Sequence, residues 1–195
     1  MTLANQLTAA RIFLSPIFVL AFMQEGFWAR VAALAIVVMS ELTDGFDGHI
    51  ARSRGEVTDF GKLLDPLADS ISRITVFIAF MSVGLIPWWM VLIFVYRDSA
   101  VSTLRTVCAS KGLVLAARGS GKLKAIIQAT VIIAILLARI LVHPFPQWFN
   151  DALIQRAAWW LVLVAALWTA WSFVDYVASN RRLLAGIGAA QGRTA

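Results

Sequence analysis

The chain has 195 residues, of which 60% are hydrophobic and only 14% are charged. Soluble domains are about 45–50% apolar with roughly a quarter of their residues charged, so this composition excludes an ordinary soluble domain and predicts an integral membrane protein. The formal net charge is +6, but Lys and Arg gather at the cytoplasmic side of membrane proteins, so we expect no nucleic-acid partner.

Six segments approach the roughly 20 mostly apolar residues that a spanning helix needs. They predict an all-α protein with six transmembrane helices, at residues 7–23, 27–52, 61–84, 87–108, 123–142 and 156–177. We expect residues 1–185 to form a single transmembrane catalytic domain. Residues 186–195, with their Gly and Ala, are expected to form a flexible tail.

The basic residues predict the orientation of these helices. With a cytoplasmic N-terminus, the outer side receives only Arg30, Arg139 and Arg156. The inner side then receives Arg11, Arg52, Arg54, Lys62, Lys111, Arg118, Lys122, Lys124, Arg181, Arg182 and Arg193. This asymmetry favours an inner (cytoplasmic) membrane protein with both termini inside.

Four aspartates follow helical spacing beside the connection at residues 53–60. Asp44 and Asp47 are three apart near the inner end of the second expected helix, and Asp65 and Asp69 are four apart near the inner start of the third. Residues three or four apart share a helix face, so two antiparallel helices can direct four carboxylates at one point. Ionised Asp residues within a span are costly and usually functional.

Four carboxylates that lie this close cannot all ionise without a counter-charge. Divalent cations provide one, and oxygen-only ligands suit Mg²⁺ or Mn²⁺ better than Zn²⁺. Two such ions would bind a diphosphate and stabilise both the entering and the leaving oxygen. The alternative is a solvated acidic loop or a set of Asp–Arg pairs.

The same residues carry a family resemblance. The signature of the CDP-alcohol phosphotransferase family reads D-x-x-D-G-x-x-A-R, a short gap, then G-x-x-x-D-x-x-x-D. This chain matches every fixed position, with Asp44-Gly-Phe-Asp47-Gly48-His-Ile-Ala51-Arg52 followed by Gly61-Lys-Leu-Leu-Asp65-Pro-Leu-Ala-Asp69. The resemblance implies a bundle of six transmembrane helices, often dimeric, with its site open to the cytoplasm.

The resemblance also implies roles for individual residues. Asp44, Asp47, Asp65 and Asp69 would hold the two metal ions, with Asp69 also acting as the general base on the acceptor hydroxyl. The CDP-linked donor would lie near residues that include Asp44, Gly48, Ala51, Arg52 and Gly61. The hydroxyl would attack the β-phosphorus and release CMP.

Other segments, over about residues 5–130, resemble the bacterial phosphatidylglycerolphosphate synthase branch of this family. They are residues 5–11, 64–69, 97–98, 102–105 and 121–128. This branch implies CDP-diacylglycerol as donor, glycerol 3-phosphate as acceptor, membrane lipids as surroundings and a homodimer. Its pattern differs here at Asp98, where Glu is usual, and at Ser70, where Lys is usual.

An acceptor phosphate needs cationic partners. Five basic residues are candidates: Arg97, Arg105, Lys122 and Lys124, with Arg73 in place of the missing lysine. Inositol 1-phosphate remains an alternative acceptor, because it also carries a phosphate. A transporter and an inactive helical scaffold are alternatives from other classes, against which the inner clustering of charge and the complete motif argue.

Overall fold

The computed structural model describes the backbone of residues 3–54, 59–110 and 118–191, and the side chains of residues 6–44, 61, 64–110 and 118–181. Every regular element in these ranges is an α-helix. In chain order they are α1 (Leu3–Phe22), α2 (Phe27–Arg54), α3 (Asp59–Ser82), α4 (Trp88–Ser110), α5 (Gly119–Leu141) and α6 (Asp151–Gln191). The prediction of an all-α chain with six helices is confirmed for the described residues.

The first five helices begin and end within four residues of their predicted bounds, but the sixth prediction was too short. It was placed at residues 156–177, whereas α6 has 41 residues and runs from Asp151 to Gln191. The prediction followed the apolar residues alone, while the helix continues through a polar, Ala-containing stretch without Pro, which favours helix. Residues 186–191, expected in a flexible tail, continue α6.

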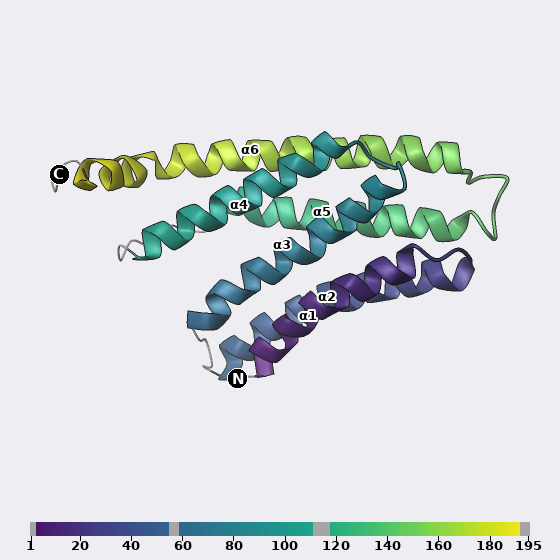
Figure 1. Cartoon of the computed structure of the whole chain (residues 1–195), viewed down its shortest axis with the longest axis horizontal. Helices are drawn as coiled ribbons and strands as arrows, with labels where there is room; N and C mark the ends of the chain where they lie inside the picture. The colour runs from purple at the N-terminus through teal and green to yellow at the C-terminus, as the bar shows by residue number, and fades with distance from the viewer. Residues whose placement is uncertain (1–2, 55–58, 111–117, 192–195) are drawn as a thin grey trace.

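The helices form two groups with α3 between them, and α2 also packs directly on α5 (Figure 1). Helices α1 and α2 pack against each other and α1 also packs on α3, whereas α6 packs on α4 and α5. Helix α3 crosses between the groups and contacts α1, α4 and α5. The turns after α1 and α3 contain Gly26 and Gly84, whose φ angles of 112° and 76° lie in the region that favours glycine.

An aromatic cluster holds the crossing of α1, α3 and α4 together. The ring centroids of Phe22 and Phe80 are 5.6 Å apart, and those of Phe77 and Phe94 are 4.3 Å apart. Phe18 stacks on Phe22 and is also buried. In α3, Phe77 and Phe80 lie in the half toward the turn at Gly84, whereas Asp65 and Asp69 of the signature lie in the other half of the helix.

Two described helices are long and apolar enough to cross a membrane, within Gly119–Leu141 and Asp151–Arg181. Helix α1 has a shorter apolar part, Gln6–Phe22, and α2, α3 and α4 carry charged residues along their length. The bundle also exposes large apolar side chains, including Phe13, Leu20 and Tyr96 at 71%, 68% and 68%. Exposed apolar surface of this kind marks a membrane or protein contact.

Candidate active site

The acidic residues of α2 and α3 meet around the buried Arg11 of α1. Its Nη1 atom donates to Asp44 Oδ1 at 2.5 Å and to Asp69 Oδ1 at 2.6 Å. These two carboxylate oxygens are therefore at most about 5 Å apart, although Asp44 and Asp69 lie on different helices. On the same face of α1, Thr8 donates to Asp65 Oδ1 at 2.8 Å. Helix α1 thus holds three of the four predicted carboxylates at one end of the bundle.

These residues fit divalent cations by their chemistry. All the expected ligands are carboxylate oxygens, as Mg²⁺ and Mn²⁺ prefer, and the side chains of Asp44 and Asp69 remain about a third exposed, at 36% and 31%. The side chain of Asp47 lies outside the described residues. Among the described side chains, no group of three or more acidic, His or Cys residues has metal-binding geometry, so the four-carboxylate metal site remains a prediction.

The predicted donor-binding residues are only partly described. The side chains of Gly48, Ala51 and Arg52 lie outside the described residues, although their positions belong to α2. Gly61 is buried in α3. Of the five predicted donor-binding residues, only Asp44 has a described side-chain contact, with Arg11.

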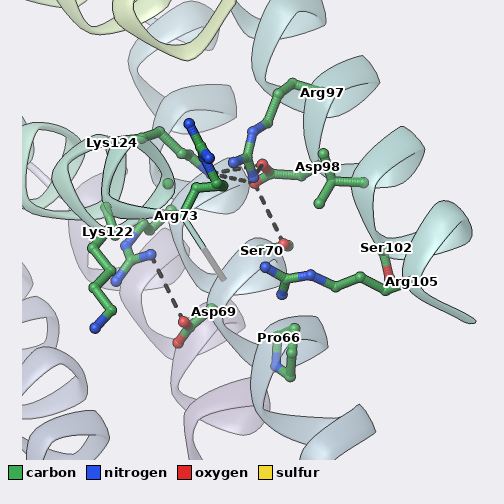
Figure 2. A pocket seen from close by; sticks show the side chains of 14 residues that line it. Pro66, Asp69, Ser70, Arg73, Arg97, Asp98, Ser102, Arg105, Lys122 and Lys124 are labelled. Atoms are coloured by element: carbon green, nitrogen blue, oxygen red, sulfur yellow. Dashed lines mark hydrogen bonds and ion pairs between the residues drawn. The ribbon is translucent and has the colours of Figure 1, made fainter. Parts of the chain in front are cut away.

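Next to Asp69 lies a cavity of about 240 Å³ between α3, α4 and α5 (Figure 2). The structure brings all five predicted acceptor-phosphate residues to this one cavity, together with Arg118, which was not predicted for it. Only two acidic residues line the cavity, Asp69 and Asp98, so its lining is strongly cationic. The basic residues that line it are Arg73, Arg97, Arg105, Arg118, Lys122 and Lys124.

Asp98 neutralises part of this cationic lining. Lys124 Nζ donates to both Asp98 oxygens, at 2.6 and 2.8 Å, and Arg97 Nη1 donates to Oδ1 at 3.0 Å. Ser70 donates to Oδ2 at 3.4 Å. Both unusual positions of the branch pattern, Asp98 and Ser70, therefore belong to one hydrogen-bonded group. Lys124 and Asp98 are buried, so this lysine is largely committed to an ion pair.

Arg73 is also held by carboxylate partners. Its Nε and Nη2 atoms donate to the two carboxylate oxygens of Glu41 at 3.2 and 3.3 Å, and its Nη1 lies 3.8 Å from Asp69 Oδ2. Arg73 thus connects the acidic site to the cationic cavity. Glu41 was not predicted as a site residue. Its position three residues before Asp44, on a neighbouring part of the same helix, was the available signal.

Two cations of the cavity have no carboxylate partner among the described residues. They are Arg105 of α4 and Lys122 of α5, whereas Arg118 pairs with Asp175 at 3.0 Å. Arg105 extends from α4 toward Ser70 in α3 (Figure 2). A phosphate that entered the cavity would meet two cationic side chains that form no ion pair with a described carboxylate. Asp69 lies at the edge of the same cavity.

Sequence reasoning missed the contribution of α1 and α6. Arg11 was noted only as an inner-side basic residue and as part of a similar N-terminal segment, yet a charge in an apolar helix is a signal for a functional role. Helix α6 was predicted from its apolar residues alone, but its Ser172 accepts a hydrogen bond from Arg97 Nε at 3.2 Å. Isolated Ser and Thr residues in an apolar helix give no comparable signal.

Comparison with known proteins agrees with these observations. A model of the CDP-alcohol phosphatidyltransferase family matches residues 1–171. A probable phosphatidylglycerophosphate synthase of Mycobacterium tuberculosis (strain CDC 1551 / Oshkosh) is 36% identical over 188 residues, covering 95% of this chain and 84% of the relative. The CDP-diacylglycerol–glycerol-3-phosphate 3-phosphatidyltransferase of Bacillus subtilis (strain 168) is 34% identical, over 88% of this chain and 92% of the relative. An enzyme of the same name from Yersinia pestis (strain Pestoides F) is 31% identical, over 88% and 90%.

Proposed function

This chain belongs to the CDP-alcohol phosphatidyltransferase family, and on that premise we propose that it transfers the phosphatidyl group of CDP-diacylglycerol to glycerol 3-phosphate. The products are CMP and phosphatidylglycerol phosphate. The relatives that carry this activity in their names cover most of the chain. The observation that supports the acceptor is the cavity beside Asp69, where Arg105 and Lys122 have no carboxylate partner among the described residues.

The proposed reaction uses Asp69 as the general base. A hydroxyl of glycerol 3-phosphate attacks the phosphorus that carries the diacylglycerol group and forms a new P–O bond. The P–O bond to CMP breaks, CMP leaves with the bonding electron pair, and Asp69 takes the hydroxyl proton. A positioned base of this kind contributes about 10²–10⁴-fold to the rate.

We assign the metal site to Asp44, Asp47, Asp65 and Asp69. Two divalent cations, Mg²⁺ or Mn²⁺, held there would stabilise the negative charge of the diphosphate as it shifts to the leaving CMP. Arg11 and Thr8 orient three of these carboxylates, those of Asp44, Asp65 and Asp69, from α1. The donor would lie along α2 beside Gly48, Ala51 and Arg52, at the side of the carboxylates away from the cationic cavity.

The cavity supplies the acceptor site of this proposal. Arg105 and Lys122 bind the phosphate directly, and Arg97 offers the nitrogen atoms that Asp98 and Ser172 leave free. Arg73 and Lys124 act mainly through their carboxylate partners, which fix the shape and charge of the wall. Inositol 1-phosphate is the second candidate acceptor, since Ser70 leaves more room than the lysine that is usual in the branch.

We further propose that residues 1–185 form one catalytic domain that spans the inner membrane six times as a homodimer, with both termini and the site on the cytoplasmic side. The two apolar helices and the exposed Phe13, Leu20 and Tyr96 support a membrane location. Accessibility of single cysteines placed at residues 120 and 150, read with a membrane-impermeant thiol reagent in intact spheroplasts, tests the orientation. Labelling of residue 120 from outside would contradict it.

The activity is tested by CMP release from CDP-diacylglycerol with Mg²⁺ or Mn²⁺. We expect turnover with glycerol 3-phosphate and little with inositol 1-phosphate. Asp69→Asn should remove turnover, whereas Arg156→Gln, an exposed change at the other end of the bundle, should not. Turnover with inositol 1-phosphate alone would reassign the acceptor, and no CMP release with either would contradict the proposed reaction.

A further inference from the structure

A second cavity lies at the end of the bundle opposite the candidate active site. It has a volume of about 180 Å³, and its polar lining residues are Arg30, Arg139, Asp151 and Gln155. Val83, which directly follows α3, also lines it, and 13 residues of that helix separate its last residue, Ser82, from Asp69, or about 20 Å at 1.5 Å per residue. The two cavities are therefore separate sites.

The two arginines of this outer cavity form no ion pair with a described carboxylate, and other contacts hold them in place. Arg30 Nη1 donates to the backbone carbonyl of Arg139 at 2.7 Å, and the Arg139 guanidinium lies 4.4 Å from the centre of the Phe22 ring. Among the described residues, no carboxylate lies within 4 Å of either guanidinium, although Asp151 lines the same cavity. Each guanidinium carries five N–H donors, and one described hydrogen bond uses only one of these ten.

Two fixed guanidiniums with free donors beside a cavity match a phosphate group, whose oxygens accept paired hydrogen bonds from Arg. The surroundings favour a lipid as its source. Trp28 and Trp148 are exposed at this end, at 79% and 72%, and Trp side chains are enriched at membrane–water interfaces. We propose that the outer cavity binds the phosphate of a phospholipid headgroup, at the membrane face opposite the active site.

The test is native mass spectrometry of the full-length protein in detergent with dioctanoylphosphatidylglycerol added. We expect a lipid adduct whose affinity falls about tenfold in Arg30→Gln, since a charge-assisted hydrogen bond contributes about 1.5–3 kcal/mol and 1.4 kcal/mol corresponds to tenfold. Arg139→Gln should act similarly but also loses the contact with Phe22, so Arg30→Gln is the deciding variant. Arg156→Gln, on the same end of the bundle, is the matched control and should bind like the wild type.

Three results would overturn the assignment. An adduct that persists in Arg30→Gln but disappears in Arg105→Gln places the lipid in the active site. Equal binding of dioctanoylglycerol, which lacks phosphate, removes the role of the arginines. Binding of inorganic phosphate with the same dependence on Arg30, strong enough to displace the lipid, identifies a free-anion site. Unchanged CMP release by Arg30→Gln shows that the variant is folded.

A different observation concerns the face of α6 toward the candidate active site. Thr169, Ser172 and Tyr176, three and four residues apart, are all buried. Ser172 Oγ accepts a hydrogen bond from Arg97 Nε at 3.2 Å and donates to the carbonyl of Thr169 at 2.8 Å. The Arg105 guanidinium lies 5.8 Å from the centre of the Tyr176 ring. Because Asp175 of α6 also pairs with Arg118, helix α6 contacts three of the cavity arginines, through residues beyond the matched positions 1–171.

We infer that Ser172 and Tyr176 are positioning residues for the acceptor phosphate, which rests on the proposed function. Ser172 fixes the Nε side of Arg97 while Asp98 fixes Nη1, so the rest of the guanidinium is presented in one orientation. Arg105 has no carboxylate partner among the described residues, and the face of Tyr176 offers it a cation–π contact. The Tyr176 hydroxyl is buried and has no hydrogen-bond partner within the described part of the chain, so the contact with Arg105 comes from the ring.

Steady-state CMP release separates a positioning role from a structural one. We expect Ser172→Ala and Tyr176→Leu to raise the KM for glycerol 3-phosphate about five- to tenfold, since each removes an interaction of about 1 kcal/mol or more. The KM for CDP-diacylglycerol should stay within about twofold. Tyr176→Phe, which keeps the ring, should behave like the wild type and is the matched control.

Arg105→Gln distinguishes failure of this inference from failure of the proposed function. If it raises the KM for glycerol 3-phosphate while Ser172→Ala and Tyr176→Leu leave it unchanged, the positioning role is wrong and the acceptor site stands. If Arg105→Gln leaves the KM for glycerol 3-phosphate unchanged, the proposed acceptor site is wrong, and so is the positioning role of α6. Equal increases in both KM values would indicate a general loss of structure and would also overturn the inference.

Discussion

Asp98 is the central carboxylate of the cationic cavity, and its replacement by Asn should destabilise the whole bundle. It accepts hydrogen bonds from Lys124 at 2.6 and 2.8 Å and from Arg97 at 3.0 Å. The side chains of Lys124 and Arg97 are only 6% and 12% exposed, so water cannot replace the lost charge. Removing one partner of a buried ion pair costs about 3–5 kcal/mol.

The reciprocal change should cost less. Lys124→Met removes a buried cation but leaves Asp98 with Arg97 and with Ser70, so we expect a loss of about 1–3 kcal/mol. The double variant Asp98→Asn/Lys124→Met removes both charges of the pair. It should be more stable than Asp98→Asn alone by about 2 kcal/mol, within the usual coupling between contacting residues.

Thermal unfolding in detergent, followed by the fluorescence of the eight tryptophans, measures these differences without relying on activity. For a chain of this size each kcal/mol shifts the midpoint by about 2–4 °C, so Asp98→Asn should unfold at least about 6 °C below the wild type. Asp175→Asn is the control, since Asp175 pairs with the more exposed Arg118 and should change the midpoint little. Equal midpoints for Asp98→Asn and Asp175→Asn, or a double variant less stable than either single variant, would refute the reasoning.

Three further predictions follow from the contacts of the site. Arg11→Ala should lower the free energy of unfolding by about 3 kcal/mol, because Asp44 and Asp69 lose the buried guanidinium that they share and only Asp69 keeps a second cation, Arg73 at 3.8 Å, and Arg11→Lys should restore part of this in the same unfolding measurement. Removal of divalent cations with EDTA should abolish CMP release, and Mg²⁺ or Mn²⁺ should restore it; activity that persists without any divalent cation would exclude the assigned metal mechanism. Glu41→Gln should raise the KM for glycerol 3-phosphate about tenfold by releasing Arg73, since a hydrogen bond to a charged group contributes about 1.5–3 kcal/mol, and an unchanged KM would show that Arg73 needs no such anchor.

Local sequence patterns were sufficient to predict the helices and the types of residue that form the candidate site. Apolar runs of spanning length gave six helices, and five of them lie within four residues of their predicted bounds. The spacing of Asp65 and Asp69 placed both on one side of α3, because helical periodicity is a local property. The end of α6 was missed for the same reason, since hydrophobicity reports which part of a helix is buried in an apolar environment and not where the helix stops.

The sequence by itself determined that the chain is helical, that its acidic residues cluster at one end, and that five basic residues gather beside them. Only the tertiary structure decided which of these charges are already paired. Arg11 reaches carboxylates 33 and 58 residues away, and Lys124 reaches Asp98 across 26 residues. These pairs depend on how α1, α3, α4 and α5 cross, which is set by packing between side chains of different helices and leaves no periodic signal in any one of them.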